Sequence, residues 1–305
     1  MSHFFFDQLA TFNPYYARFA PDATTPLINL TAAIDATFFT LWIGNNDVLG
    51  YALAGGASDS LTPPAMFSQL YGMILNACIL NQDGAYDDAK GAVANIPDVL
   101  SIPYVTYMST QVPYNGMVLT QEQAAGLNTL YQMYGHPEIT FEAGQNAWVV
   151  ENSDGTWGRM TANDLLLLSL PTDSMKCHGM GVANPAIPAP FPIPHKYILD
   201  AAEIADIRNH IDQYNATIHD LATMHNLALV DLNQVLEEAK TGIIVDGIEF
   251  TSTFIQGNVF STDGIHLCPL GNALVAWYFI EAINATYGAS IPQVNVTDYN
   301  GVQFP

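Results

Sequence analysis

Three short apolar runs, separated by segments with helical spacing, constrain the fold of this chain more than any other feature. The runs cover residues 36–43, 91–96 and 227–232, and each has the length of a buried strand. Strands that alternate with helices are joined by crossover connections, which produce parallel sheets covered by helices on both faces. The sequence therefore predicts an α/β fold built on a buried parallel sheet.

The helical segments support this interpretation along most of the chain. Between residues 200 and 226, apolar side chains recur in steps of three and four, which places them on one stripe of a helix. A similar helix is expected at 269–287, and another at 120–134 with Thr120 as its N-cap. A further helix is expected to begin at the proline pair 63–64, because proline suits the first helical turn.

The middle of the chain has a different pattern. An Asp-Gly pair at 154–155 lies between two short apolar runs and indicates a β-hairpin. Residues 164–170 have the composition of a strand, whereas residues 171–194 are rich in Pro, Gly and Ala and are expected to form a long surface loop. We therefore expect one domain over residues 1–305, with an insertion at about residues 135–197.

The charge composition excludes two classes of partner. The 305 residues include 29 acidic and 7 basic side chains, which gives a formal charge of −22. A chain this negative repels phosphate groups, so neither nucleic acid nor an anionic membrane surface is an expected partner. Half of the residues are hydrophobic, which is enough for a large core. No apolar run reaches about 18 residues, so we expect no membrane span.

Cysteine and histidine spacing gives no metal-binding pattern. The three cysteines, Cys78, Cys177 and Cys268, are far apart and show no CxxC spacing. This spacing argues against a zinc ribbon and a disulfide scaffold, and it leaves open one disulfide with one free thiol. The histidines show neither HxH nor HExxH spacing, so those other than His266 are expected at the surface.

A polar cluster, Gly44-Asn45-Asn46-Asp47, follows the first apolar run. Open α/β sheets bind ligands at the carboxyl ends of their strands. An asparagine amide at that position can donate a hydrogen bond to a developing oxyanion. The same four residues also have the composition of a simple turn, in which Asn and Asp side chains bond to the nearby backbone.

A second cluster, Asp263-Gly264-Ile265-His266, precedes the last expected helix. A carboxylate three residues before a histidine can accept a hydrogen bond from Nδ1 of the ring, which leaves Nε2 free to act as a base. The alternative is an Asp-Gly turn that is followed by an unrelated histidine. Both clusters fall in expected strand-to-helix loops on one edge of the sheet, and this placement favours a shared site.

The two clusters together resemble blocks III and V of the SGNH (GDSL-like) lipase/acylhydrolase family. Gly44, Asn46 and Asp47 match the GxND block, and Asp263 and His266 match the DxxH block. The similarity to an exported bacterial subgroup extends through residues 13–20, 95–104, 171–181 and 246–305. The resemblance therefore covers most of the chain.

This resemblance implies a fold, a reaction and a location. The fold is a three-layer α/β/α sandwich with a five-stranded parallel sheet in flavodoxin-like order. The reaction is hydrolysis of a carboxylic ester of a small molecule, lipid or carbohydrate, with no metal or organic cofactor. Asn46 donates to the oxyanion, His266 is the general base, and Asp263 orients His266. The location is secreted, periplasmic or associated with the outer membrane.

The serine nucleophile that the family requires is not found. In the family this serine lies in a GDS-like block before GxND, and an oxyanion glycine lies between the two blocks. The only serine before Gly44 is Ser2, which has no preceding strand or glycine. Ser60, in the SDSL string at 58–61, follows GxND and lies in the glycine-rich stretch 50–62, so we expect it to be a loop serine.

These departures are consistent with a chain that lacks the first two family blocks. In that case a central strand is missing, and its absence exposes a strand edge to pairing with another chain. We therefore expect self-association or low stability. Two rival functions remain open: a non-catalytic surface protein that binds carbohydrate or lipid on the retained hydrolase fold, and a cytoplasmic metalloenzyme.

Overall fold

The central sheet of the computed structural model has three parallel strands in the order β1-β2-β11. The structure describes residues 5, 13–34, 36–57, 60–80 and 89–302. β1 (Phe38–Leu41) pairs with β2 (Lys90–Ala94), and β2 pairs with β11 (Ala228–Val230). β1 and β11 lie within their predicted apolar runs, and β2 overlaps the run 91–96 but begins one residue earlier, at Lys90. The chain therefore has a mixed α/β fold with a parallel sheet, as predicted.

Three long helices occur where the sequence predicted them. α4 spans Pro64–Ile79 with a proline in its first turn, α8 spans Ala201–Met224, and α10 spans Pro269–Tyr287. Asp200 accepts hydrogen bonds from backbone N–H groups in the first turn of α8, and Glu203 accepts in return from the N–H of Asp200. This capping box fixes the position at which α8 begins.

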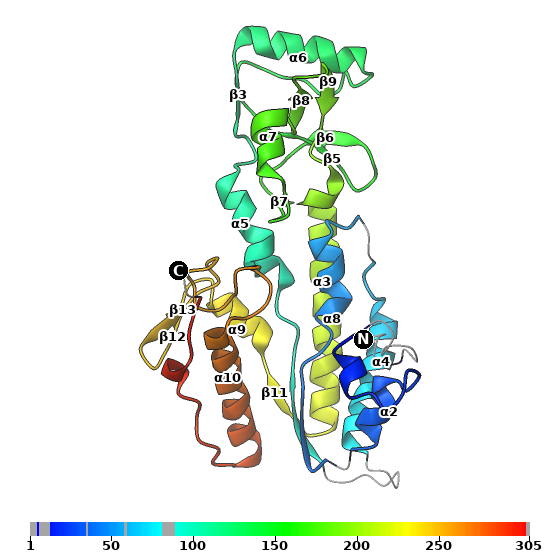
Figure 1. Cartoon of the computed structure of the whole chain (residues 1–305), viewed down its shortest axis with the longest axis vertical. Coiled ribbons are helices and arrows are strands. Elements are labelled where there is room, and N and C mark those ends of the chain that lie inside the picture. The colour runs from blue at the N-terminus through cyan, green and yellow to red at the C-terminus, as the bar shows by residue number, and fades with distance from the viewer. Residues whose placement is uncertain (1–4, 6–12, 35, 58–59, 81–88, 303–305) are drawn as a thin grey trace.

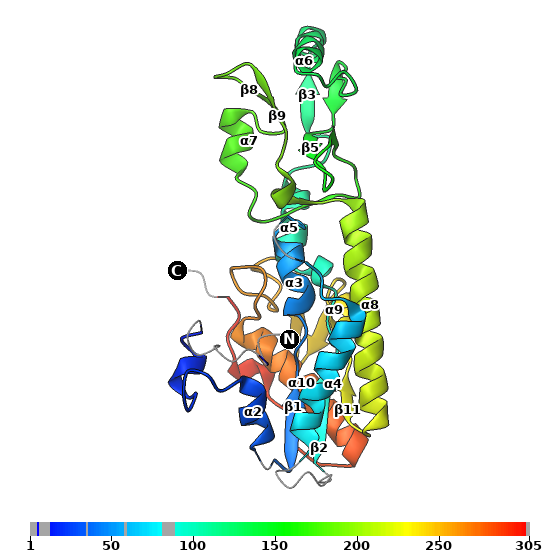
Figure 2. The same cartoon turned by 90° about the vertical axis from the view of Figure 1, so that its right-hand side faces the viewer.

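Helices cover both faces of the sheet (Figures 1 and 2). Successive side chains of a strand point to opposite faces. In β2, Ala92 and Ala94 pack against residues of α10, whereas Val93 belongs to the core that also contains residues of α4 and α8. The small alanines leave room for α10 to lie close to the sheet.

The remaining elements are shorter. The other α-helices are α2 (Leu27–Ala32), α3 (Asn46–Leu53), α5 (Pro103–Gln111), α6 (Gln121–Met133), α7 (Thr172–His178) and α9 (Leu232–Glu238), and the 3₁₀ helices are η2 (Tyr16–Arg18), η3 (Val99–Ser101), η4 (His195–Tyr197) and η5 (Val296–Asp298). The other strands are β3 (Met117–Leu119), β4 (Gly144–Asn146), β5 (Val149–Glu151), β6 (Trp157–Arg159), β7 (Leu165–Leu166), β8 (Val182–Asn184), β9 (Ala189–Phe191), β10 (Ile198–Leu199), β12 (Ile243–Val245) and β13 (Ile248–Phe250).

The elements from β3 to β9 form a lobe beyond the sheet, at the top of Figure 1. α5 leads into this lobe and α8 leads back to the sheet. One of its apolar clusters joins Tyr131 of α6 with Phe141 and Val149. α6 therefore packs with the lobe, although it precedes the insertion boundary expected near residue 135. The helix itself has the predicted N-cap, because the hydroxyl of Thr120 accepts from the N–H of Gln123.

The segment before α8 corrects two predictions and confirms a third. Residues 164–170 form a strand only at β7, which pairs with β10. Residues 171–194 are not a long loop, since they contain α7 and an antiparallel hairpin of β8 and β9. One glycine there ends an element: Gly179 is the C-cap of α7, with φ +71°. The predicted hairpin at 154–155 is confirmed by the antiparallel pairing of β5 and β6.

β1 lies at an edge of the sheet, and this corrects its predicted burial. Within the described residues β1 pairs only with β2. Phe38 is 38% exposed and Thr40 is exposed, whereas Leu41 is buried. The run 36–43 is therefore only partly buried. The resemblance implies five strands, and the described residues contribute three to this sheet.

The described residues contain no disulfide, because Cys78, Cys177 and Cys268 are free thiols. Cys268 is buried at the N-cap of α10, where its thiol donates to the carbonyl oxygen of Asn258 at 3.1 Å. Burial raises the pKa of the Cys78 thiol to about 11. None of the helices among the described residues has the length and apolar character needed to span a membrane.

Candidate active site

The loop after β1 turns sharply at Gly44. Its φ of +105° is a conformation that side-chain-bearing residues rarely adopt. A Cβ atom at this position would lie 2.9 Å from Phe67 Cε2 and 3.0 Å from Ile96 Cδ1. Both neighbours are fully buried, so they have little room to move. The glycine therefore lets the chain pass close to the core and start α3 directly afterwards.

α3 begins at Asn46, which corrects part of the loop expected over residues 50–62. Asp47 is buried in the first turn of this helix, and its Oδ1 accepts a hydrogen bond from the hydroxyl of Thr62 at 2.8 Å. Asp47 therefore ties the segment that follows α3 back to the start of the helix. Asn46 precedes it and is exposed, so its amide is accessible from solvent.

Asp263 and His266 form a hydrogen-bonded pair in the loop before α10. Nδ1 of His266 lies 2.6 Å from Oδ2 of Asp263. The other carboxylate oxygen of Asp263 accepts from the N–H groups of Ile265 and His266, both at 2.9 Å, and from the hydroxyl of Ser261 at 2.7 Å. Gly264 makes the turn possible with φ +72° and accepts from the N–H of Tyr104 at 3.0 Å. The loop therefore contains both the predicted Asp-Gly turn and the predicted hydrogen bond between Asp263 and His266.

These hydrogen bonds determine the ionisation of Asp263. Partial burial raises the pKa of the carboxyl group, but the bonds from Ile265, His266 and Ser261 lower it by more. The net result holds the pKa of Asp263 well below its usual value near 3.8. Because an ionised carboxylate can only accept, Nδ1 of His266 donates this hydrogen bond, and in the neutral form of the ring Nε2 is the proton acceptor.

One open cavity brings the two clusters together. It has a volume of about 550 Å³, and its lining includes Gly44, Asn46 and Asp47 from one segment and Ile265 and His266 from the other. The side chain of His266 is 80% exposed, so its ring is accessible within this cavity. Asn46 and His266 are 220 positions apart in the sequence (266 − 46), and the fold places them around one space.

The lining of this cavity contains no serine, threonine or cysteine within the described part of the chain. Ser261 is nearby in sequence, but its hydroxyl donates to Asp263. Ser60 is exposed and is not among the lining residues. Ser2 and residues 58–59 of the SDSL string lie outside the described residues. The nucleophile therefore stays unassigned.

Sequence reasoning assigned no individual role to two other cavity residues, Trp42 and Asn45, although Asn45 belongs to the predicted polar cluster. The indole nitrogen of Trp42 and Oδ1 of Asn45 are buried without a hydrogen-bond partner. Buried polar atoms of proteins are usually paired, so two unpaired atoms beside one cavity indicate a place for a ligand or water. A tryptophan two residues before Gly44 was the available signal, but burial of its nitrogen depends on distant segments.

The expectation that the other histidines lie at the surface is wrong for His195. Its Nε2 lies 2.7 Å from Oε1 of Glu203, and the two side chains are 15% and 3% exposed. Burial raises the pKa of Glu203 above its usual value, although hydrogen bonds from Asp200 and His195 oppose the shift. This pair joins the end of the lobe to α8 and does not line the cavity of His266.

Within the described residues, no three His, Cys, Asp or Glu side chains come together as a metal site. No protein-family model, curated protein or solved structure matches this chain.

Proposed function

We propose that this chain is a carboxylic ester hydrolase scaffold of the Ser-His-Asp type, as its resemblance to the SGNH family implies. The observation that carries the proposal is the shared cavity, which has the Asn46 amide and the His266 ring in its lining. The bond from His266 to Asp263 adds the orientation that a general base requires.

Each residue has a defined role in the proposed reaction. A hydroxyl oxygen attacks the ester carbonyl carbon while Nε2 of His266 removes its proton. Asp263 stabilises the imidazolium that forms, and the Asn46 amide donates to the oxyanion. The proton then passes from His266 to the leaving alcohol oxygen. In the family that the chain resembles, the attacking hydroxyl belongs to a serine.

The second candidate is a non-catalytic protein that binds a carbohydrate or lipid on the same fold. The absence of a hydroxyl or thiol side chain from the cavity lining, within the described residues, favours this candidate. In that case His266 and Asn46 would bind a ligand oxygen and no ester would be cleaved.

Hydrolysis of p-nitrophenyl butanoate and labelling by a fluorophosphonate separate the two candidates. We expect turnover that falls at least about 100-fold in His266→Ala, because general-base catalysis typically contributes a factor of about 10² to 10⁴. His219→Ala is the matched control, since His219 is exposed on α8 and does not line the cavity. Turnover that His266→Ala retains would contradict the assignment of the base. Binding of the ester without turnover would favour the non-catalytic binding protein over the hydrolase.

We also propose the finer features that the resemblance implies. α10 on one face of the sheet and α4 with α8 on the other support a three-layer α/β/α sandwich. The formal charge of −22 favours solubility and suits a protein that acts outside the cytoplasm. Fractionation of the source cells tests the location: recovery only in the cytoplasmic fraction would contradict it.

A further inference from the structure

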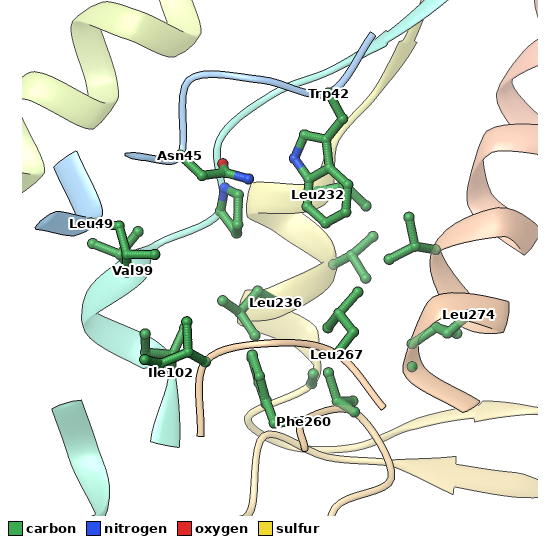
Figure 3. A pocket seen from close by; sticks show the side chains of 17 residues that line it. Trp42, Asn45, Leu49, Val99, Ile102, Leu232, Leu236, Phe260, Leu267 and Leu274 are labelled. Atoms are coloured by element: carbon green, nitrogen blue, oxygen red, sulfur yellow. The ribbon is translucent and has the colours of Figure 1, made fainter. Parts of the chain in front are cut away.

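A second, narrower cavity lies next to the candidate active site. It is lined almost entirely by apolar side chains from η3, α9, α10 and the segment 259–267. Figure 3 shows Leu236, Leu267 and Phe260 around its interior. Transfer of an apolar group into such a space is favourable because it removes apolar surface from water.

The two cavities are continuous. Trp42, Asn45, Leu49, Ile265 and Leu267 line both of them. A ligand held beside His266 in the open cavity can therefore extend an apolar group into the narrow one. This continuity identifies the narrow cavity as part of the same site.

Two unpaired polar groups mark the junction. Figure 3 shows the Asn45 amide and the indole nitrogen of Trp42 turned toward each other at one end of the narrow cavity. The indole N–H can only donate, and the Asn45 amide can donate or accept. The indole N–H of Trp42 is a buried donor without a partner, so a carbonyl oxygen at the junction can accept a hydrogen bond that an alkyl group would leave unmade. Oδ1 of Asn45 is an acceptor and needs a donor, such as a water molecule or the N–H of an amide.

The size of the narrow cavity sets the length of the apolar group. Its volume is about 120 Å³. A dry apolar cavity of about 150 Å³ accommodates benzene, so by proportion this one holds about five carbon atoms. A chain of that length fills the cavity, a methyl group leaves most of it empty, and the additional carbons of a longer chain extend beyond it.

We propose that the narrow cavity binds the acyl chain of a short, unbranched ester of about four to six carbons. The carbonyl oxygen lies at the junction, where the indole N–H of Trp42 donates to it in addition to the Asn46 amide, and the alcohol part lies in the open cavity beside His266. This inference names the substrate class for the proposed hydrolase and rests on that function, but the chain-binding step can be measured without catalysis.

Primary amides serve as non-hydrolysed stand-ins for the ester, and isothermal titration calorimetry measures their binding. From acetamide to hexanamide we expect the affinity to rise about fourfold for each added methylene. Octanamide should bind no more tightly than hexanamide. Trp42→Phe should weaken every amide by about two- to tenfold, through loss of one hydrogen bond, without changing the dependence on chain length.

Variants that fill the cavity give the decisive comparison. Val235→Phe and Val275→Phe place a larger side chain at partly exposed lining positions, and either should reduce hexanamide affinity to that of acetamide. Val118→Phe is the matched control, because Val118 is 70% exposed on the lobe. The proposal would be overturned if amide affinity did not change with chain length, or if octanamide bound more tightly than hexanamide. It would also be overturned if both cavity variants folded and kept the wild-type dependence of affinity on chain length.

The same measurements test the proposed hydrolase and the proposed chain-binding cavity separately. His266→Ala should retain the amide series, because the ring does not line the narrow cavity. If amide affinity rises with chain length but no ester is turned over, the result supports the chain-binding cavity and rejects the hydrolase. If esters are turned over but amide affinity does not change with chain length, the result supports the hydrolase and rejects the chain-binding cavity.

Discussion

Gly44 lies in a backbone conformation and a tight space that both oppose a side chain. Gly44→Ala should therefore lower the free energy of unfolding by about 2–4 kcal/mol, through the strained φ and overpacking against Phe67. Gly126→Ala is the matched control, because a Cβ at this helical position meets no atom within 4 Å. The control should stabilise the protein by up to about 1 kcal/mol. Urea unfolding that gives both variants the same change would contradict this reading of Gly44.

Asp263 predicts a particular dependence of stability on pH. Its pKa is lower in the folded protein than the ordinary value near 3.8, so the folded state favours the ionised form. The stability from this group is present above the unfolded-state pKa and is lost as the pH falls through the lower folded-state pKa. Urea unfolding between pH 2.5 and 5 should show a steeper loss on acidification in the wild type than in Asp263→Asn. Parallel curves of unfolding free energy against pH for the two proteins would contradict the lowered pKa of Asp263 in the folded state.

At the residue scale, the sequence predicted contacts well where they depend on local spacing. Asp263 and His266 are three positions apart, and one turn is enough to join them. Asn46 was predicted from its place after a strand, which also needs little long-range information. The unpaired Trp42 nitrogen and the buried pair of His195 and Glu203 were missed, because their burial results from segments far apart in the chain.

At the scale of elements, we expect self-association because one edge of β1 is unpaired within the described residues. Its backbone pairs with β2 on one side only, within the described residues, and Phe38 and Thr40 are exposed. Exposed strand edges pair readily with other chains, and a lysine on the edge prevents this. We expect light scattering to show association that Thr40→Lys reduces and the exposed-helix control Thr129→Lys does not. A stable wild-type monomer would contradict the proposal.

Elements with strong local signals were predicted, and elements stabilised by their neighbours were not. α8 and α6 begin at side chains that cap them, and α4 and α10 begin with proline. The helix and hairpin within residues 171–194 were predicted as a loop, because proline is frequent there. Their short length makes them dependent on the apolar clusters of the lobe, which no local pattern reveals.

At the scale of the whole molecule, the fold brings together two segments from near the two ends of the chain. The segment after β1 and the segment before α10 meet at the carboxyl edge of the sheet, and they line both cavities. The lobe lies beyond this edge and is joined to it by α5 and α8 (Figure 2). Parallel topology predicts such a meeting point, whereas the shape and depth of the cavities depend on packing that the sequence does not display.

The central claim is that Asn46 and His266 act on one bound ester. NMR spectroscopy of the ¹⁵N-labelled protein tests it most directly, through titration with butanamide and observation of the Asn46 side-chain amide and the His266 ring nitrogens. We predict that both sets of signals shift together and give a single dissociation constant. Shifts at only one of the two residues, or two different dissociation constants, would contradict the claim.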